Sequence, residues 1–194
     1  MCLNSILYFI KGIFILLINN MKLAIIGKMG SGKSTCAEYL NKNHDFKILS
    51  FGGPVKKYVQ EIFNDTTKNR ELIQTFAQKI KEIDKDVWVN HLLRNIKDSE
   101  NIIIDDVRFP NEYNALEKAG FKFIKLNITD EFQIERLIDT YPENYNSHIS
   151  RCGDISESYV DLLHADYFYN VNKKTESKLN SSLDNIVKNL DIKD

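Results

Sequence analysis

The sequence predicts an α/β fold in three layers, with a central parallel sheet of five strands between two layers of helices. Apolar runs suited to strands alternate along the chain with segments suited to helices, which is the pattern of a parallel sheet. Two runs, Leu23–Ile26 and Ile102–Asp105, are nearly continuous in Ala, Ile and Leu, as expected for central strands covered on both faces. The length of 194 residues fits one domain with a full hydrophobic core.

The other elements follow from their end signals. Proline suits the first turn of a helix, Thr or Asn suits the cap before it, and Gly suits the residue after its last turn. The remaining strands are expected at Lys47–Ser50, Phe121–Leu126 and Tyr167–Asn170. Helices are expected at Pro54–Phe63, Lys68–Ile83 after a Thr67 cap, Val87–Ile96, Glu112–Ala119 between Asn111 and Gly120, from Thr129 onward, and from Lys178 to Leu190.

Residues 21–194 are expected to form a single domain with two insertions. The segment 64–100 places two helices between the second and third strands. The segment 139–155 is rich in Asn, Tyr, Ser, Gly and Pro, a composition typical of a mobile loop. These segments are the expected moving parts beside a rigid sheet.

The first strand runs into G-x-x-x-x-G-K-S at Gly27–Ser34, the spacing of a phosphate-binding P-loop. A glycine-rich turn without function is the alternative, but a chance match to the four fixed positions has odds on the order of one in a hundred. Lys33 would reach the β- and γ-phosphates of ATP, and the Ser34 hydroxyl would coordinate Mg²⁺. The expected nucleotide-binding residues are Gly27, Lys28, Gly30, Ser31, Gly32, Lys33, Ser34 and Thr35.

A second polar cluster follows the third strand, at Asp105, Asp106 and Arg108. In P-loop proteins a carboxylate at a strand end helps to hold Mg²⁺, and the planar fork of arginine can bind a phosphate through two hydrogen bonds. Asp106 is the expected magnesium ligand, although the pleat turns only one of the two aspartates toward the site. The alternative is an aspartate that caps the turn, with Asn111 capping the next helix.

The P-loop and four later segments occur in the order seen in phage-type deoxynucleoside monophosphate kinases. The four segments are Lys68–Gln74, Asp86–Trp88, Asp106–Glu112 and Asp154–Glu157. The chain resembles that family over residues 22–172. The resemblance implies a nucleoside monophosphate kinase-like P-loop fold and transfer of the γ-phosphoryl group of ATP to a deoxynucleoside monophosphate. It further implies that Asp106 is the acid of the strand motif and that Arg70 and Arg108 grip the acceptor phosphate. Trp88 would pack near the base or, equally, belong to the core.

The chain departs from the family near residue 154. Asp154 stands where the family has a histidine before the Ser156-Glu157 pair, and His148 lies nearby as a displaced counterpart. Asp154-x-x-Glu157 also matches an ordinary helix capping box, which is the favoured interpretation. Phosphoryl transfer needs cations from parts that close over both substrates, and Arg136 and Arg151 beside the 139–155 lid are the candidates.

The leading functional hypothesis is an ATP-dependent kinase of (deoxy)nucleoside monophosphates. Another P-loop small-molecule kinase, of the phosphomevalonate or dephospho-coenzyme A type, is the alternative within the class. A nucleotide-binding switch protein is the alternative outside it, although no Asn/Thr-Lys-x-Asp guanine signature is present. The net charge of −1 does not indicate nucleic-acid binding, which favours a basic protein. Three scattered cysteines suit a reducing compartment, so a cytoplasmic location is expected; no motif bears on oligomeric state.

Residues 1–20 form an apolar stretch broken by Lys11 and Gly12. It is short for a membrane span, which needs about 20 apolar residues, and it lacks the basic start and cleavage site of a signal peptide. Met21 directly precedes the first strand. We therefore expect a native start at Met21, with a membrane-attached helix over 1–20, in an accessory protein, as the alternative.

Overall fold

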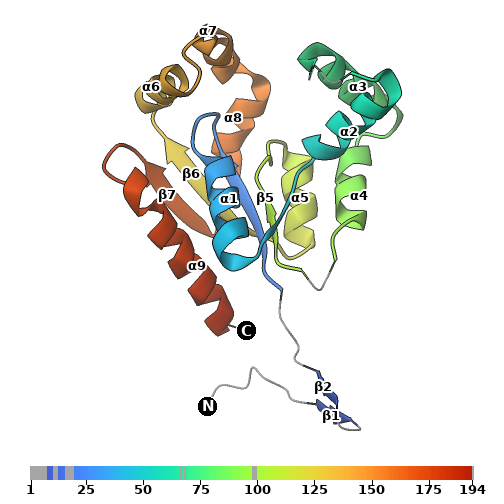
Figure 1. Ribbon diagram of the computed structural model, residues 1–194, viewed down its shortest axis with the longest axis vertical. Coiled ribbons are helices and arrows are strands. Elements are labelled where there is room, and N and C mark those ends of the chain that lie inside the picture. Colours follow the sequence, from blue (N-terminus) through green and yellow to red (C-terminus); the bar gives the residue numbers. More distant parts are fainter. Residues whose placement is uncertain are drawn as a thin grey trace.

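A computed structural model describes residues 8–10, 13–15, 20–65, 67, 69–97 and 100–193. Its main sheet has five parallel strands in the order β4-β5-β3-β6-β7 (Figure 1). These strands are β3 (Lys22–Gly27), β4 (Lys47–Leu49), β5 (Ile102–Ile104), β6 (Lys122–Ile128) and β7 (Tyr167–Val171). The predicted α/β class and all five predicted strands are confirmed, with ends that differ by one or two residues.

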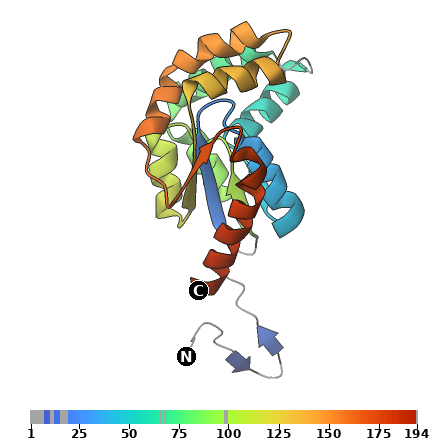
Figure 2. The same ribbon diagram turned by 90° about the vertical axis from the view of Figure 1, so that its left-hand side faces the viewer.

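Two hydrophobic clusters sandwich the sheet, because alternate side chains of β3 point to opposite faces. Leu23 and Ile25 pack on the side of α1 (Lys33–His44) and α9 (Leu179–Lys193). Ala24 and Ile26 pack on the side of α4 (Val87–Arg94), α5 (Pro110–Lys118) and α8 (Ile155–Leu162). Figure 2 separates these two helical layers on either side of the sheet.

The remaining helices stand at the carboxyl end of the sheet, on the two sides of the loop that follows β3 (Figure 1). On one side are α2 (Gly52–Phe63) and α3 (Arg70–Ile83). On the other are α6 (Asp130–Thr140), α7 (Tyr145–Ile149) and the 3-10 turn η1 (Ser150–Gly153). A second 3-10 turn, η2 (Glu176–Lys178), precedes α9. Ligands of open α/β sheets bind at this end.

Several predicted ends were wrong. The α3 cap is Asn69, whose side chain accepts from the Leu72 N–H at 3.1 Å, whereas the Thr67 N–H is bonded to Asp65; Lys68 lies outside the described residues. The helices α2 and α5 begin at Gly52 and Pro110, each two residues earlier than predicted. The Thr129 cap of α6 is confirmed, since its side chain accepts from the Phe132 N–H.

The segment 139–155, predicted as a mobile loop, contains two short helices. Residues 145–149 form α7 and residues 150–153 form η1. The polar composition of the segment suggested a loop, but a tertiary contact orders it. Tyr141, at the end of α6, stacks on His148 of α7 with 3.9 Å between the ring centroids. The segment therefore consists largely of short helices.

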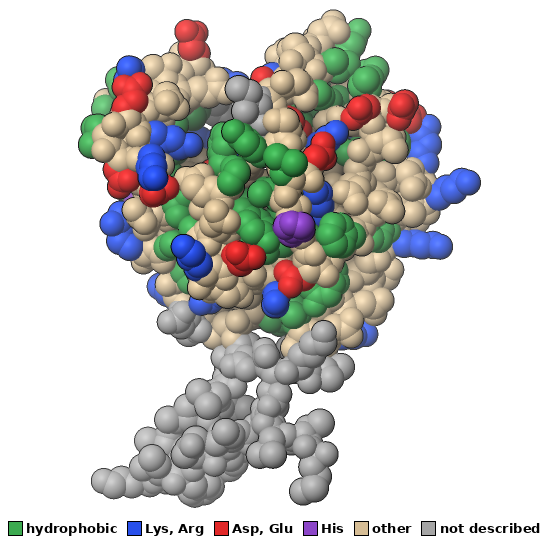
Figure 3. Space-filling view, turned by 180° about the vertical axis from the view of Figure 1, so that it is seen from behind, with side chains coloured by type: hydrophobic (Ala, Val, Ile, Leu, Met, Phe, Trp, Pro, Cys, Tyr) green, Lys and Arg blue, Asp and Glu red, His purple; other side chains and the backbone are tan. Residues whose placement is uncertain are grey.

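Within 1–20 the structure describes the antiparallel strands β1 (Tyr8–Ile10) and β2 (Ile13–Ile15) and residue 20; the rest of the extension lies outside the described residues. Among the helices that the structure describes, none has the length and apolarity to cross a membrane. Over the face shown in Figure 3, acidic and basic side chains are interspersed around a hydrophobic middle.

Candidate functional site

The loop between β3 and α1 has the backbone of an anion-binding turn. Gly30 and Gly32 have φ angles of 77° and 95°, in the left-handed region that residues with a Cβ rarely adopt. Gly32 is the N-cap of α1 and has no side chain with which to cap the first turn of that helix. The N–H groups at the start of such a helix suit an anion, and the helix dipole adds positive potential at the same place.

Lys33 is buried against the loop that it follows. Its Nζ donates to the carbonyl oxygens of Gly27 at 2.6 Å and Lys28 at 2.9 Å. Burial, followed by the nearby Arg108 charge, lowers the pKa of Lys33 to about 8. A buried ammonium group whose partners among the described residues are two carbonyls is poised to pair with an anion.

Ser34 and Asp105 form an oxygen-rich pair at the start of α1 and the end of β5. The Ser34 hydroxyl donates to Asp105 Oδ2 at 2.9 Å. Asp106 instead accepts from the backbone N–H groups of Phe51 and Gly52, both at 2.9 Å. Of the two aspartates, Asp105 therefore contacts Ser34, whereas Asp106, the predicted magnesium ligand, is bonded to the start of α2. Partial burial raises the pKa of Asp106.

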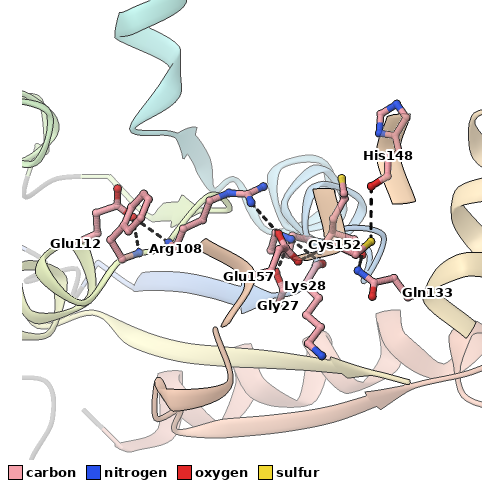
Figure 4. A network of polar contacts seen from close by, with 11 residues as sticks. Gly27, Lys28, Arg108, Glu112, Gln133, His148, Cys152 and Glu157 are labelled. Carbon is pink, nitrogen blue, oxygen red and sulfur yellow. Dashed lines mark hydrogen bonds and ion pairs between the residues drawn. The ribbon is translucent and has the colours of Figure 1, made fainter. Parts of the chain in front are cut away.

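Glu157 connects three separate elements. Its Oε2 accepts from the Met29 N–H in the loop at 2.7 Å, and its Oε1 accepts from Arg108 Nη1 at 2.8 Å. Figure 4 shows Arg108 extending from Glu112 toward Glu157, beside Gly27 and Lys28. The capping-box interpretation of Asp154-x-x-Glu157 was wrong, since the Asp154 side chain makes no cap bond and Glu157 faces the loop.

Arg136 approaches the loop from α6. A Cβ placed on Gly32 would lie 3.6 Å from Arg136 Nη1. Arg136 shares a cavity of about 540 Å³ with Lys33, Ser34, Asp105 and Arg108. Gly30, Gly32, Thr35 and Asp106 also line this cavity. Residues that follow three strands, together with residues of α2 and α6, thus surround one space with two arginines, two lysines (Lys33 and Lys56) and two carboxylates.

Other expected site residues lie elsewhere. The Arg151 guanidinium bonds to the Ser147 carbonyl and to His148 Nδ1, both at 2.8 Å, and it does not line this cavity. Arg70 is exposed at the start of α3 and also lies outside the cavity lining. The Lys28 side chain pairs with Asp130 and Asp161. Trp88 is buried and donates to the Ala77 carbonyl at 3.2 Å.

Ser31 and Gly27 belong to the loop but lie outside the cavity lining. The Ser31 side chain is buried, and its Oγ has no partner among the described residues. Gly27 ends β3 and accepts from Lys33.

Two carboxylates that the sequence motifs contain, Glu112 and Glu157, were not among the predicted site residues. Glu112 Oε2 accepts the N–H groups of Arg108 and Phe109 at 2.9 and 3.0 Å, and burial raises the pKa of Glu112 to about 7. A signal for Glu112 existed, since it stands at the third position of a helix that begins with proline, where a glutamate caps the preceding N–H groups. The partners of Glu157 lie 49 and 128 residues away, which no local pattern indicates.

A family model described as AAA domain matches residues 23–156. The chain belongs to the AAA domain family. The matched range runs from β3 into α8, so this AAA domain includes the P-loop, the β5 motif and Arg136.

Solved structures share the fold of this AAA domain at low sequence identity. The shikimate kinase of Bacteroides thetaiotaomicron has a TM-score of 0.54 at 14% identity, over 87% of this chain and 98% of that one. The shikimate kinase of Acinetobacter baumannii, solved with shikimate, has a TM-score of 0.52 at 15% identity, over 88% and 94%. The protein TT1252 of Thermus thermophilus has a TM-score of 0.56 at 13% identity, over 89% and 99%. No curated protein matches the sequence. The AAA domain therefore has a P-loop kinase fold.

Proposed function

We propose that this protein is an ATP-dependent kinase that transfers the γ-phosphoryl group to a nucleoside monophosphate. The observation that carries the proposal is the 540 Å³ cavity, in which the P-loop faces Asp105, Arg108 and Arg136. Phosphoryl transfer requires two aligned anions and cations that offset the charge on the transferred group. This cavity has the cations, and it lies between two groups of helices that can close over it.

The donor side is assigned to the loop. The N–H groups of the first turn of α1 and Lys33 would hold the phosphates of ATP. The oxygens of Ser34 and Asp105, 2.9 Å apart, are hard donors of the kind that Mg²⁺ binds. Bound there with phosphate oxygens, Mg²⁺ would neutralise charge on the β- and γ-phosphates. Asp105 takes the metal role that the sequence had suggested for Asp106.

The acceptor side is assigned to Arg108. Its guanidinium is held by Glu157 at 2.8 Å, and its side chain, which is 37% exposed, lines the cavity. A phosphate acceptor is already an anion near neutral pH, so the reaction needs an arginine to place it and no general base. Arg136, next to Gly32, is placed to contact the phosphate that is transferred.

A coupled ADP-release assay tests this proposal. The acceptors are the common ribo- and deoxynucleoside monophosphates, with shikimate as a comparison because two structural neighbours are shikimate kinases. We expect turnover with at least one nucleoside monophosphate and its loss in Lys33→Ala. Turnover with none of them would overturn the substrate class, and turnover that survives Lys33→Ala would overturn the role of the loop.

A further inference from the structure

A second, smaller cavity adjoins the phosphate cavity. Its volume is about 220 Å³, and it lies among α2, α3, α4 and the start of α5. Asp106 and Arg108 line both cavities. Drug-sized ligands occupy pockets of roughly 300–1,000 Å³, so this space suits one ring system that is joined to a phosphate at Arg108.

One wall of the smaller cavity is aromatic and fixed. Phe51 and Trp88 are both buried and both line it. The Trp88 indole is tied to the Ala77 carbonyl and flanked by Tyr58 and Phe76, with centroid separations of 6.4 and 6.2 Å. A wall held in this way suits the flat face of a heteroaromatic ring.

Four charged side chains line this cavity: the carboxylates Asp106 and Glu112, and the cations Lys81 and Arg108. Glu112 is only 6% exposed. Both of its hydrogen bonds use Oε2, and within the described part of the chain no group donates to Oε1. Lys81 lies on α3, with its Nζ 4.8 Å from the centroid of the Phe109 ring. Glu112 lines the cavity, and a carboxylate oxygen without a donor in a nearly buried side chain favours a ligand that supplies one.

We propose that this cavity receives the base of the acceptor nucleotide and that Glu112 Oε1 accepts a hydrogen bond from an N–H group on the edge of that base. The inference rests on the proposed function and adds the residue that selects among acceptors. Arg108 stands at the border of the two cavities, where the acceptor phosphate would enter the larger one. Above pH 7, where Glu112 is mostly ionised, an acceptor that placed a carboxylate beside it would be repelled, so the site then discriminates against organic acids such as shikimate.

Trp88 offers a direct readout of binding in this cavity, because it is the only tryptophan in the chain. We expect nucleoside monophosphates to change its fluorescence saturably in the wild-type protein, whereas shikimate at the same concentration leaves it unchanged. A response to shikimate alone would overturn the inference. This measurement needs neither a variant nor turnover.

The sharper test is Glu112→Gln. Its amide oxygen can keep the two backbone N–H bonds that begin α5, so the NH₂ group would face the cavity and replace an acceptor by a donor. A site built to bond a substrate N–H discriminates strongly when its polarity is wrong. We expect kcat/KM for the preferred acceptor to fall by about 100-fold, with a shift in preference toward bases that present a carbonyl oxygen and an unchanged Kd for ATP.

Glu117→Gln is the matched control, since Glu117 lies on the same helix and its bond to Tyr113 is exposed. It should leave acceptor selectivity and the Trp88 response as in the wild type. Equal losses for all acceptors in Glu112→Gln, without a change in preference, would overturn the base contact while the kinase activity stands. A Trp88 response that depends on Glu112, without phosphoryl transfer, would instead sustain the cavity assignment and overturn the proposed function.

Discussion

Removal of the Glu157 carboxylate should loosen the P-loop and Arg108 together. The Glu157 side chain is 3% exposed, and it accepts from the Met29 N–H at 2.7 Å and from Arg108 Nη1 at 2.8 Å. A hydrogen bond to a charged group contributes about 1.5–3 kcal/mol. Breaking a fully buried ion pair costs about 3–5 kcal/mol, but Arg108 is 37% exposed, so water replaces part of that interaction. We expect Glu157→Ala to lower the free energy of unfolding by about 2–3 kcal/mol.

Thermal unfolding and kinetics measure this effect separately. In a chain of this length 1 kcal/mol corresponds to about 2–4 °C, so the Tm of Glu157→Ala should fall by about 4–12 °C. Glu157→Gln keeps an acceptor oxygen and should lose about 1 kcal/mol. In both variants kcat should fall at least about tenfold, because Arg108 loses the group that orients it.

Glu143→Gln is the control, because Glu143 is an exposed residue between α6 and α7. It should leave Tm and kcat as in the wild type. An unchanged Tm and kcat in Glu157→Ala would refute the reasoning. A lower Tm with normal kcat would refute the part that makes Glu157 a positioning residue for Arg108.

Three further predictions concern the phosphate cavity. The pKa of Lys33 is lowered to about 8 by burial, so its charged form is present below pH 8 and is lost above it; ATP affinity should therefore fall between pH 7 and pH 9.5. Asp105→Asn should raise the Mg²⁺ concentration needed for activity without lowering Tm. Asp106→Asn should instead lower the free energy of unfolding by about 1–2 kcal/mol, because the Phe51 and Gly52 N–H groups lose a charged acceptor. Arg108→Ala should slow transfer about 100-fold and change the Kd for ATP much less.

A different result would contradict each of these predictions. A Lys33→Met variant should bind ATP weakly at every pH, so a pH dependence that persists in it would assign the titration to another group. Equal effects of the two aspartate substitutions on Mg²⁺ demand would contradict the separate roles of Asp105 and Asp106. A loss of ATP affinity in Arg108→Ala as large as the loss of kcat would place Arg108 on the donor side.

The local parts of the site could be predicted from the sequence. The P-loop is a contiguous pattern whose glycines, lysine and serine act through backbone geometry, and the central strands are apolar on both faces. The choice between the lid arginines also had a local signal. Gln133, Arg136 and Leu137 lie on one face of α6 at helical spacing, and Gln133 donates to the Met29 carbonyl while Leu137 is buried. Arg151 lies in a 3-10 turn and bonds within it.

The remaining parts depend on contacts between distant segments. Asp105 and Asp106 are neighbours, and only the position of α1 relative to the 51–52 turn decides which one meets Ser34. Glu157 resembles a capping residue in sequence, yet its partners belong to the loop after β3 and to the segment after β5. Trp88 lines a cavity that exists only because α3 packs near α4 and α2. Tertiary packing, which local patterns do not encode, therefore assembles the acceptor side.

The fate of the γ-phosphoryl group tests the central claim most directly. ATP labelled at the γ-phosphorus is incubated with the protein, Mg²⁺ and the best nucleoside monophosphate, and the products are separated. We predict label in the β-position of the nucleoside diphosphate, with one ADP formed for each labelled product and no label transferred by Lys33→Ala. Label found only in inorganic phosphate, or in the protein itself, would contradict it.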